Sequence, residues 1–339
     1  MHFDLDEDQR ALQDTVRRLA EEVFPVERTR GWAEPGGFDR AAWSALAELG
    51  TFAVYQPEER GGLALPVVNA VLAYQTLGAC LVPGPLVAAA LAADLDSDSG
   101  AVGSGEVVPA VVVRPEPGAP LLVEHLRDAD VVYVLDTHGI ERLDPAALTA
   151  TAVTAPLDPT TPLSLVTDLP RGEEVGDAAQ AARWSLLGSL LSSALLVGHA
   201  LRVLDLAVTY AQQREQFGRP IGTFQAVKHM LADCFARGEV ARAVVDAAGV
   251  IVDEPGALDI TEPGPDGASA VRAVAAARVL AAEAALLNCR NAIQVHGGMG
   301  FTWEVDLHLH LKRALLLETS YTTSDAAAEA VAQSLQRVP

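Results

Sequence analysis

Three long segments rich in Ala, Leu and Val dominate the second half of this chain. They span residues 178–213, 223–253 and 268–295, and a shorter segment of the same kind spans 323–336. Apolar residues recur in all four at helical spacing, so each segment is predicted to be a helix. Together they predict a C-terminal four-helix bundle.

The first half of the chain contains two kinds of sequence pattern, one after the other. Its opening part carries helical patterns, and the part after "DLDSDSG" carries short β-branched runs separated by Pro, Gly and Asp, which are typical of short strands. The helices are expected at 4–23, 38–49, 65–79 and 85–95, and the strands within 101–170. We therefore predict an α+β fold that is mostly α. Its expected domains are an N-terminal helical domain (1–97), a small reduced middle β domain (98–172) and the bundle (173–339).

Charge and composition restrict the partners. The formal net charge is −21, so the surface repels nucleic acid and anionic lipid, and we expect neither as a partner.

Apolar runs such as "VVNAVLAY" are shorter than the roughly 18 to 20 residues that cross a bilayer. The acidic N-terminus does not resemble a secretory signal. Cys80, Cys234 and Cys289 are far apart, as core residues in a reducing compartment are. These features favour a soluble, cytoplasmic protein.

The run "QREQFGRPIGTFQ", residues 213–225, interrupts the long helices. Its turn residues are explained by chain geometry alone. The first helix is expected to end at Gly218, Pro220 to set a turn, and Thr223 to cap the next helix.

Arg214, Phe217 and Gln225 are not explained in this way, because a turn between helices requires no particular cation, aromatic ring or amide. An arginine can bind a pyrophosphate through paired, charge-assisted hydrogen bonds, and an amide can bind a neighbouring polar group. A ligand site is therefore one interpretation of this run, and ordinary helix punctuation is the other.

A second run, "IQVHGGMGFTWEVDLHLHLKR", covers residues 293–313. The paired Gly297 and Gly298 would let a ligand approach the backbone and leave amides free to meet phosphate. A helix that simply ends in glycine explains the pair equally well. A strand before it and a helix after it are both missing from the pattern, so a Rossmann-type dinucleotide site is not expected.

Three histidines in this run do not predict a metal site. His308 and His310 are about 200° apart on a helix, so they do not share one ion easily, and no Cys or Asp cluster joins His296 or the others. We expect no metal.

Taken together, the two runs resemble the acyl-CoA dehydrogenase family. The family's Arg-x-x-Phe-Gly-x-x-Ile signature, with the "FQ" that follows it, matches Arg214, Phe217, Gly218, Ile221, Phe224 and Gln225. Its later Gln-x-x-Gly-Gly-x-Gly signature matches Gln294, Gly297, Gly298 and Gly300. The segment "PEERGGLAL", residues 57–65, and the α, β, α order are also similar to the family, so the resemblance covers nearly the whole chain.

The resemblance implies an FAD-dependent oxidoreductase that desaturates an acyl-CoA thioester. In this family a Glu takes the α-proton while the flavin accepts the β-hydrogen as hydride. The flavin ring is held by the middle β domain of one subunit, and the ADP half by the bundle of its neighbour. The implied cofactor-binding residues here are Arg214, Phe217, Ile221, Gln225, Gln294, Gly297 and Gly298.

The catalytic half of the resemblance is incomplete. The four tryptophans lie outside the middle domain, so the family's Trp-Ile-Thr flavin-stacking segment has no counterpart. Tyr321 occupies the usual base position, and Asp205 is the only carboxylate near the family's other base position. Glu318, one helical turn before Tyr321, is a candidate base. Alternatively, Glu318 is a surface residue near a helix cap without a catalytic role. The catalytic residue is otherwise unknown from the sequence.

These departures favour one hypothesis over two alternatives. The chain resembles the shortened subunit of actinobacterial hetero-oligomeric (α2β2) acyl-CoA dehydrogenases, in which a second acyl-CoA dehydrogenase-like subunit would supply the base and the acyl-CoA pocket. The implied substrate is a bulky acyl-CoA, possibly with a steroid side chain, and the implied electron acceptor is an electron-transferring flavoprotein. The first alternative is a self-sufficient homo-oligomer that uses Glu318 or an unrecognised base. The second is a non-catalytic oligomerisation scaffold.

Overall fold

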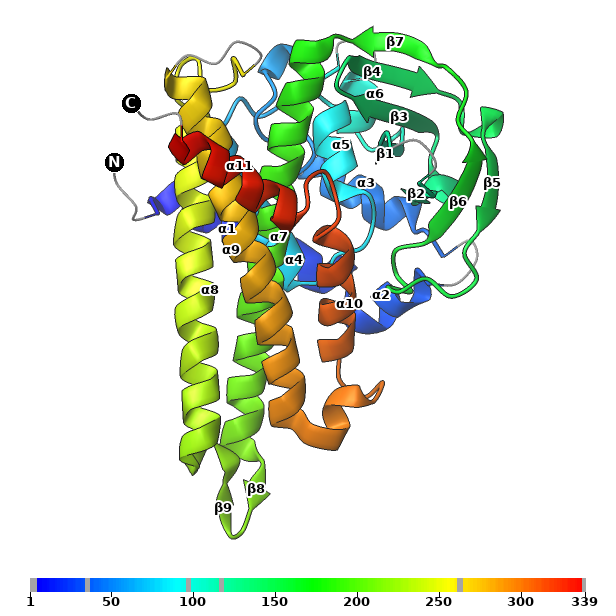
Figure 1. The fold of residues 1–339 in the computed structure, drawn as a ribbon. Helices are drawn as coiled ribbons and strands as arrows, with labels where there is room; N and C mark the ends of the chain where they lie inside the picture. The colour runs from blue at the N-terminus through cyan, green and yellow to red at the C-terminus, as the bar shows by residue number, and fades with distance from the viewer. Residues whose placement is uncertain (1–4, 34–36, 96–98, 116–118, 261–264, 337–339) are drawn as a thin grey trace.

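The computed structural model describes residues 5–33, 37–95, 99–115, 119–260 and 265–336. A bundle of long helices runs through the whole length of the molecule, and the strands of the middle domain lie beside its upper end (Figure 1). The bundle consists of α7 (Ala178–Gln213), α8 (Gln225–Val252), α9 (Pro265–His296) and α10 (Leu307–Leu317), and α11 (Ser324–Gln336) packs against α9. The predicted C-terminal helical bundle is confirmed, but its fourth helix is α10, and the predicted segment 323–336 forms α11 instead.

The apolar composition of α7 follows from its place in the fold. Among the described residues, α7 is a helix long and apolar enough to cross a membrane, but 89% of its most apolar window is buried inside the protein. It contacts α4, α8, α9 and α10, so its residues face protein on nearly every side. We read α7 as the central core helix of the fold.

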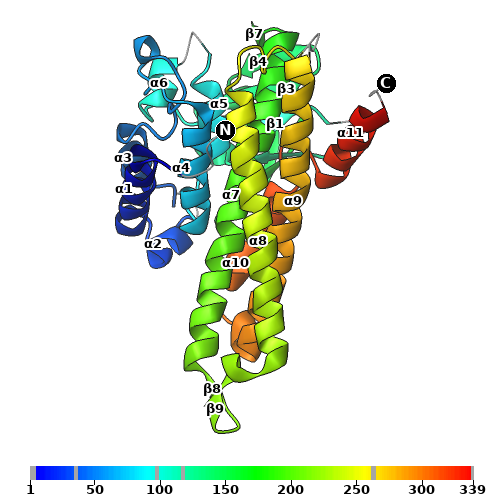
Figure 2. The ribbon, with the colours of Figure 1, turned by 90° about the vertical axis from the view of Figure 1, so that its left-hand side faces the viewer.

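The N-terminal domain is helical, as predicted. In Figure 2 its helices form a layer on one side of the bundle, and α4 lies between α1 and α7. The helices are α1 (Glu7–Val23), α2 (Val26–Gly31), α3 (Arg40–Glu48), α4 (Val67–Ala79), α5 (Leu86–Ala92) and α6 (Ser99–Gly103). Four of them match the predicted segments, and the short α2 and α6 do not.

The middle domain consists of two small sheets that enclose a core of their own, which includes Val112, Val123, Val132 and Val134. One sheet has the order β1-β3-β4-β7, in which β1 and β3 are parallel, and the other has the antiparallel order β2-β6-β5. The strands are β1 (Pro109–Val113), β2 (Leu121–Glu124), β3 (Val131–Asp136), β4 (Gly139–Leu143), β5 (Thr149–Ala152), β6 (Leu163–Asp168) and β7 (Glu173–Gly176). The predicted α+β class, mostly α, is confirmed.

Candidate functional site

A β-hairpin joins α7 to α8 and forms the lower tip of the molecule in Figure 1. Its strands are β8 (Glu215–Gln216) and β9 (Arg219–Pro220), and its two-residue turn is Phe217–Gly218. Both turn residues have positive φ, +53° and +77°, as tight two-residue hairpin turns require.

Two local predictions for this segment are wrong. Helix α7 ends at Gln213 and does not reach Gly218, because residues after it pair as strands. Thr223 does not cap α8: its hydroxyl donates to the Pro220 carbonyl at 2.7 Å, and the N-cap residue is Phe224. The sequence predicts a turn in this segment correctly, but it does not predict the hairpin that contains the turn.

The hairpin presents its side chains to solvent. Phe217 is 93% exposed, and Arg214, which terminates α7, is also exposed. Within the described residues the Arg214 guanidinium makes no hydrogen bond or ion pair. The Arg219 guanidinium, by contrast, lies 4.3 Å from the centre of the Phe224 ring. Arg214 therefore keeps its full donor capacity for a group outside the described chain.

The second motif lies where α9 ends. Gly297 has a φ of +61°, and the chain turns there into the 3₁₀ helix η5 (Gly297–Phe301). A Cβ atom placed on Gly297 or Gly298 would meet no atom within 4 Å, so both glycines face open space. Gln294 is exposed beside them. This backbone is open to a ligand approaching from outside.

Both motifs are held at the same end of the bundle. Ile221 and Ile293 pack in one apolar cluster, and the Tyr210 ring stacks on His296 at 4.1 Å between centres. Seven predicted cofactor-binding residues therefore share this end, which we call the bundle tip. Ile221 is half-buried, and the exposed ones are Arg214, Phe217, Gln225, Gln294, Gly297 and Gly298.

The loop with the predicted base position is closed onto the protein. Tyr321 has a φ of +61° and packs its ring against α7 at Gly188, where an added Cβ would be 2.5 Å from the ring. Burial raises the pKa of the Tyr321 phenol well above its usual value. The space available to a base at this position is thus filled by a neutral aromatic ring.

Glu318 serves as a cap in this loop. Its Oε1 accepts hydrogen bonds from the Ser324 backbone NH at 3.1 Å and from the Ser324 hydroxyl at 2.6 Å, at the start of α11. The carboxylate is therefore engaged at a helix N-terminus, where negative charge is stabilised. Asp205, the other carboxylate considered from the sequence, is exposed on α7.

A buried arginine holds the same loop from the opposite side. Arg278 of α9 donates to the carbonyls of Leu317, Ser320 and Thr322, at 3.2 Å for Ser320 and 2.7 Å for Thr322. Burial lowers the pKa of its guanidinium to about 10, and the nearby Glu318 carboxylate opposes that shift. The backbone before and after Tyr321 is thereby fixed.

Comparisons with known proteins decide the family. The chain matches the description "Acyl-CoA dehydrogenase, N-terminal domain" over residues 6–95 and "Acyl-CoA dehydrogenase, C-terminal domain" over residues 184–336. It is 33% identical over 318 residues to the acyl-CoA dehydrogenase IpdE2 of Mycobacterium tuberculosis, and the match covers 91% of each chain. The chain belongs to the acyl-CoA dehydrogenase family.

Solved structures share its fold. The ChsE4-ChsE5 complex from Mycobacterium tuberculosis contains a chain with a TM-score of 0.86 and 24% identity, with full coverage of both chains. A structure titled as a Tcur3481-Tcur3483 steroid ACAD variant has a TM-score of 0.81 and 21% identity. The match covers 97% of this chain and 98% of that chain. The predicted family, its oxidoreductase activity on acyl-CoA and its cofactor FAD are confirmed at the family level.

The bundle tip exposes groups of the kinds that bind parts of FAD. An unpaired exposed guanidinium suits a pyrophosphate, open glycine backbone suits close approach of a phosphate, and an exposed aromatic ring suits a heterocycle. These groups belong to Arg214, Gly297 and Phe217. Within the described part of the chain, the tip residues leave all three groups accessible.

A further carboxyl group near Tyr321 was missed in the sequence. Glu124 ends β2, and its Oε1 lies 3.5 Å from the Ser320 hydroxyl. Burial raises the pKa of the Glu124 carboxyl, and Arg313 partly opposes that shift. The alternating pattern of β2 is only four residues long, which is why the sequence did not single out this strand or a site on it.

The three histidines of the second motif, His296, His308 and His310, each lie within hydrogen-bond distance of another histidine or of a backbone carbonyl. Nδ1 of His310 lies 2.8 Å from Nδ1 of His199, and Nδ1 of His296 lies 2.8 Å from the Ala292 carbonyl oxygen. Burial lowers the pKa of His310 to about 3, so this pair is neutral at pH 7. Within the described residues, no group of three or more potential ligands is placed to hold a metal ion.

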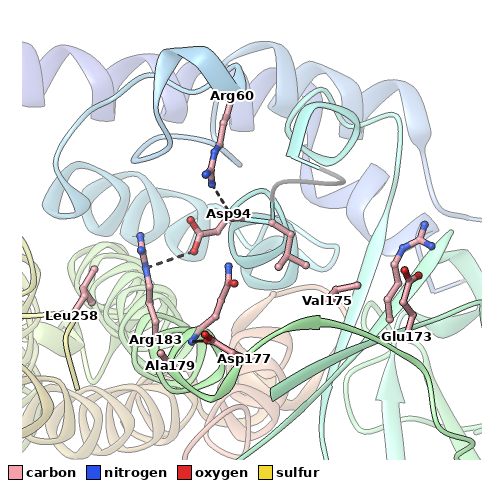
Figure 3. Close-up of a pocket in the computed structure, with 11 residues that line it drawn as sticks. Arg60, Asp94, Glu173, Val175, Asp177, Ala179, Arg183 and Leu258 are labelled. Carbon is pink, nitrogen blue, oxygen red and sulfur yellow. Dashed lines mark hydrogen bonds and ion pairs between the residues drawn. The ribbon is translucent and has the colours of Figure 1, made fainter. Parts of the chain in front are cut away.

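A polar cavity of about 740 Å³ lies between the N-terminal domain, β7 and the start of α7 (Figure 3). Asp94 lies between two arginines there: Nη1 of Arg60 donates to the Asp94 carbonyl at 3.1 Å, and Nε of Arg183 lies 3.5 Å from its carboxylate. The residues that line the cavity include three arginines and three carboxylates, which are Arg60, Arg142, Arg183, Asp94, Glu173 and Asp177. Because these charges balance, we interpret the cavity as a joint between domains.

Proposed function

We propose that this chain is the flavin-site-completing subunit of a hetero-oligomeric, FAD-dependent acyl-CoA dehydrogenase. Its bundle tip would hold the ADP half of an FAD molecule whose ring lies on a partner subunit. The partner would also provide the acyl-CoA pocket and the catalytic base. The assembly would contain two copies of each chain (α2β2).

The proposal depends chiefly on one contrast within the chain. The bundle tip exposes an unpaired Arg214 and open glycine backbone, whereas the base position is filled by Tyr321 packed on Gly188. When bound, FAD supplies the hydride-accepting chemistry. The residues of this chain would contribute binding: Arg214 would orient the pyrophosphate, and the Gly297–Gly298 amides would bind it from the other side.

The relatives support a second subunit and a bulky substrate. One similar fold comes from a complex of two differently named chains, and another is titled a steroid ACAD. A bulky acyl-CoA, such as one with a steroid side chain, is therefore the proposed substrate class. An electron-transferring flavoprotein is the proposed acceptor, by analogy with the family.

One observation favours the alternative of a self-sufficient enzyme. The Glu124 carboxyl lies beside Ser320, next to Tyr321, and its raised pKa is typical of a general base. In that case the unrecognised base would come from β2 and not from Glu318. Turnover of acyl-CoA by this chain without a partner would favour this alternative.

The ADP assignment can be tested in the complex. Arg214→Ala, co-purified with the partner, should bind FAD about ten-fold to a hundred-fold more weakly in a fluorescence titration, because a charge-assisted hydrogen-bonding group is lost. Arg242→Ala is the matched control, since Arg242 is also exposed but is paired with Glu239 on α8. Equal FAD affinity of both variants would contradict the assignment.

A further inference from the structure

A cavity of about 540 Å³ lies between the N-terminal layer of helices and the bundle. Figure 2 shows this layer beside the bundle, with α4 between α1 and α7. Helices α1 and α4 contribute one wall, and α7, α8 and α10 contribute the other. The described lining contains no residue of the bundle tip and none of the loop around Tyr321, so the cavity is separate from both regions.

Part of the wall is apolar. Phe24 follows α1, Leu72 belongs to α4, and Leu201 belongs to α7. Phe24 and Leu72 are almost fully buried, and Leu201 is half-buried. Such a wall suits a compact apolar group on a ligand.

One buried polar side chain borders the cavity with a nitrogen that no described residue bonds. His310 of α10 is 3% exposed, and its Nδ1 lies 2.8 Å from Nδ1 of His199, which leaves Nε2 without a partner among the described residues. Burial lowers the pKa of His310 to about 3, and the charge of Arg202 lowers it further, so the ring is neutral at pH 7. The contact between the two Nδ1 atoms needs one proton. When His199 provides it, His310 carries its own proton on Nε2 and offers a donor to the cavity.

Charged groups of both signs line the mouth of the cavity. Arg17 of α1 and Arg202 of α7 are exposed, and so are the carboxylates of Glu21 and Asp205. Within the described residues, none of these four side chains makes a hydrogen bond or an ion pair. They therefore keep their bonding capacity for a group from outside.

The other charged residues of the lining already have partners. These pairs are Arg242 with Glu239, Asp306 with Arg30, and Asp246 with the Gln75 amide at 2.7 Å. In the cavity of Figure 3, likewise, Arg183 pairs with Asp94. Charges without a described partner are thus confined to the four residues at the mouth.

The effect on Cys80, another lining residue, places three of these charges close together. Burial raises the pKa of the Cys80 thiol and Glu21 raises it further, whereas Arg17 and Arg202 lower it. An anion bound here would be repelled by the carboxylates, and a cation would be repelled by the guanidinium groups. A ligand that carries both charges meets an opposite charge on each side.

We propose that this cavity binds a free α-amino acid with an apolar side chain. The ligand carboxylate accepts hydrogen bonds from the Arg202 guanidinium and from Nε2 of His310. The ligand ammonium group pairs with Glu21, and the apolar side chain lies against Leu72 and Leu201. This site goes beyond the proposed role in flavin binding and does not depend on it.

Leucine is a suitable probe, and saturation-transfer NMR on the full chain measures its binding. Two analogues each remove one charge: N-acetyl-leucine lacks the ammonium group, and leucinamide lacks the carboxylate. We expect saturable binding of leucine at pH 7.5 and binding of each analogue that is weaker by at least about five-fold. No saturable signal for leucine, or an analogue that binds as tightly as leucine, would overturn the proposal.

Variants at the mouth connect each ligand charge to one residue. Arg202→Gln should weaken leucine binding about five-fold and leave leucinamide binding unchanged, because leucinamide has no carboxylate to lose a partner. Glu21→Gln should weaken leucine binding and leave N-acetyl-leucine binding unchanged. Arg18→Gln is the matched control, since Arg18 is exposed on α1 but does not line the cavity.

The pattern across ligands separates lost binding from a folding defect, which would weaken all three ligands alike. Equal weakening of leucine binding by Arg202→Gln and Arg18→Gln would overturn the proposal. Equal weakening of all three ligands by Arg202→Gln would also overturn it. FAD affinity of the Arg214→Ala complex is a separate readout, so failure of one proposal is distinguishable from failure of the other.

Discussion

The bundle tip and the loop around Tyr321 are built in opposite ways. The tip leaves a guanidinium, an aromatic ring and glycine backbone exposed, whereas the loop has its backbone carbonyls bonded to Arg278 and its aromatic ring packed against Gly188. Exposed groups without internal partners contribute little to folding, while buried and bonded ones contribute much. The comparison indicates that the tip is arranged for an external ligand and the loop for stability.

The largest expected effect comes from a buried ion pair on α10, the helix that leads into the loop around Tyr321. Asp158→Ala removes the buried partner of Arg313, which connects α10 to the middle domain, and should lower the free energy of unfolding by about 3 to 5 kcal/mol. Urea denaturation measures this. The control is Glu239→Gln, which breaks the exposed ion pair with Arg242 and should cost at most about 1 kcal/mol. Similar losses of unfolding free energy in both variants would contradict the expected difference between the buried and the exposed ion pair.

A pair of glycine substitutions compares the two regions directly. Gly188→Ala places a Cβ 2.5 Å from the Tyr321 ring and should cost about 1 to 3 kcal/mol of stability through overpacking. Gly298→Ala meets no atom within 4 Å and should change stability by less than about 0.5 kcal/mol. Thermal unfolding reports both values. A large loss at Gly298 would show that the tip has a structural role within this chain.

The buried pair of His199 on α7 and His310 on α10 predicts that stability depends on pH. Burial lowers the pKa of His310 to about 3, whereas an unfolded histidine titrates near 6.5. As pH falls from 7 to 5, the unfolded chain takes up a proton that the folded chain does not, so the free energy of unfolding decreases by about 1 to 2 kcal/mol for this group. His310→Gln should reduce the slope of stability against pH. The same change at the exposed His229 is the control for replacing a histidine at the surface.

Much of the fold could be predicted because the long helices carry many turns of periodic apolar residues, and the predicted 178–213 segment matches α7. The short strands β5 and β7 were beyond such reasoning. All four residues of β5 are exposed, and β7 has no buried residue, so neither shows alternation. Strand β7 continues to Gly176 because it pairs with β4, a contact that a sequence pattern does not contain.

The candidate site also has a part that the sequence predicts and a part that it does not. The tip residues were found because they form two contiguous motifs that resemble a family's signatures. The hairpin itself was missed, since Phe217 is an unusual residue for positive φ and Gly218 alone suggested a helix end. Glu124 could not be found, because it ends a four-residue strand and lies near Ser320 only in the folded chain.

Flavin content tests the central claim most directly. This chain should be purified alone and after co-expression with a candidate partner subunit, and each sample should be assayed for flavin absorbance and for acyl-CoA-dependent dye reduction. We predict a colourless, inactive chain alone and a yellow, active complex. A yellow and active protein from this chain alone would contradict the account.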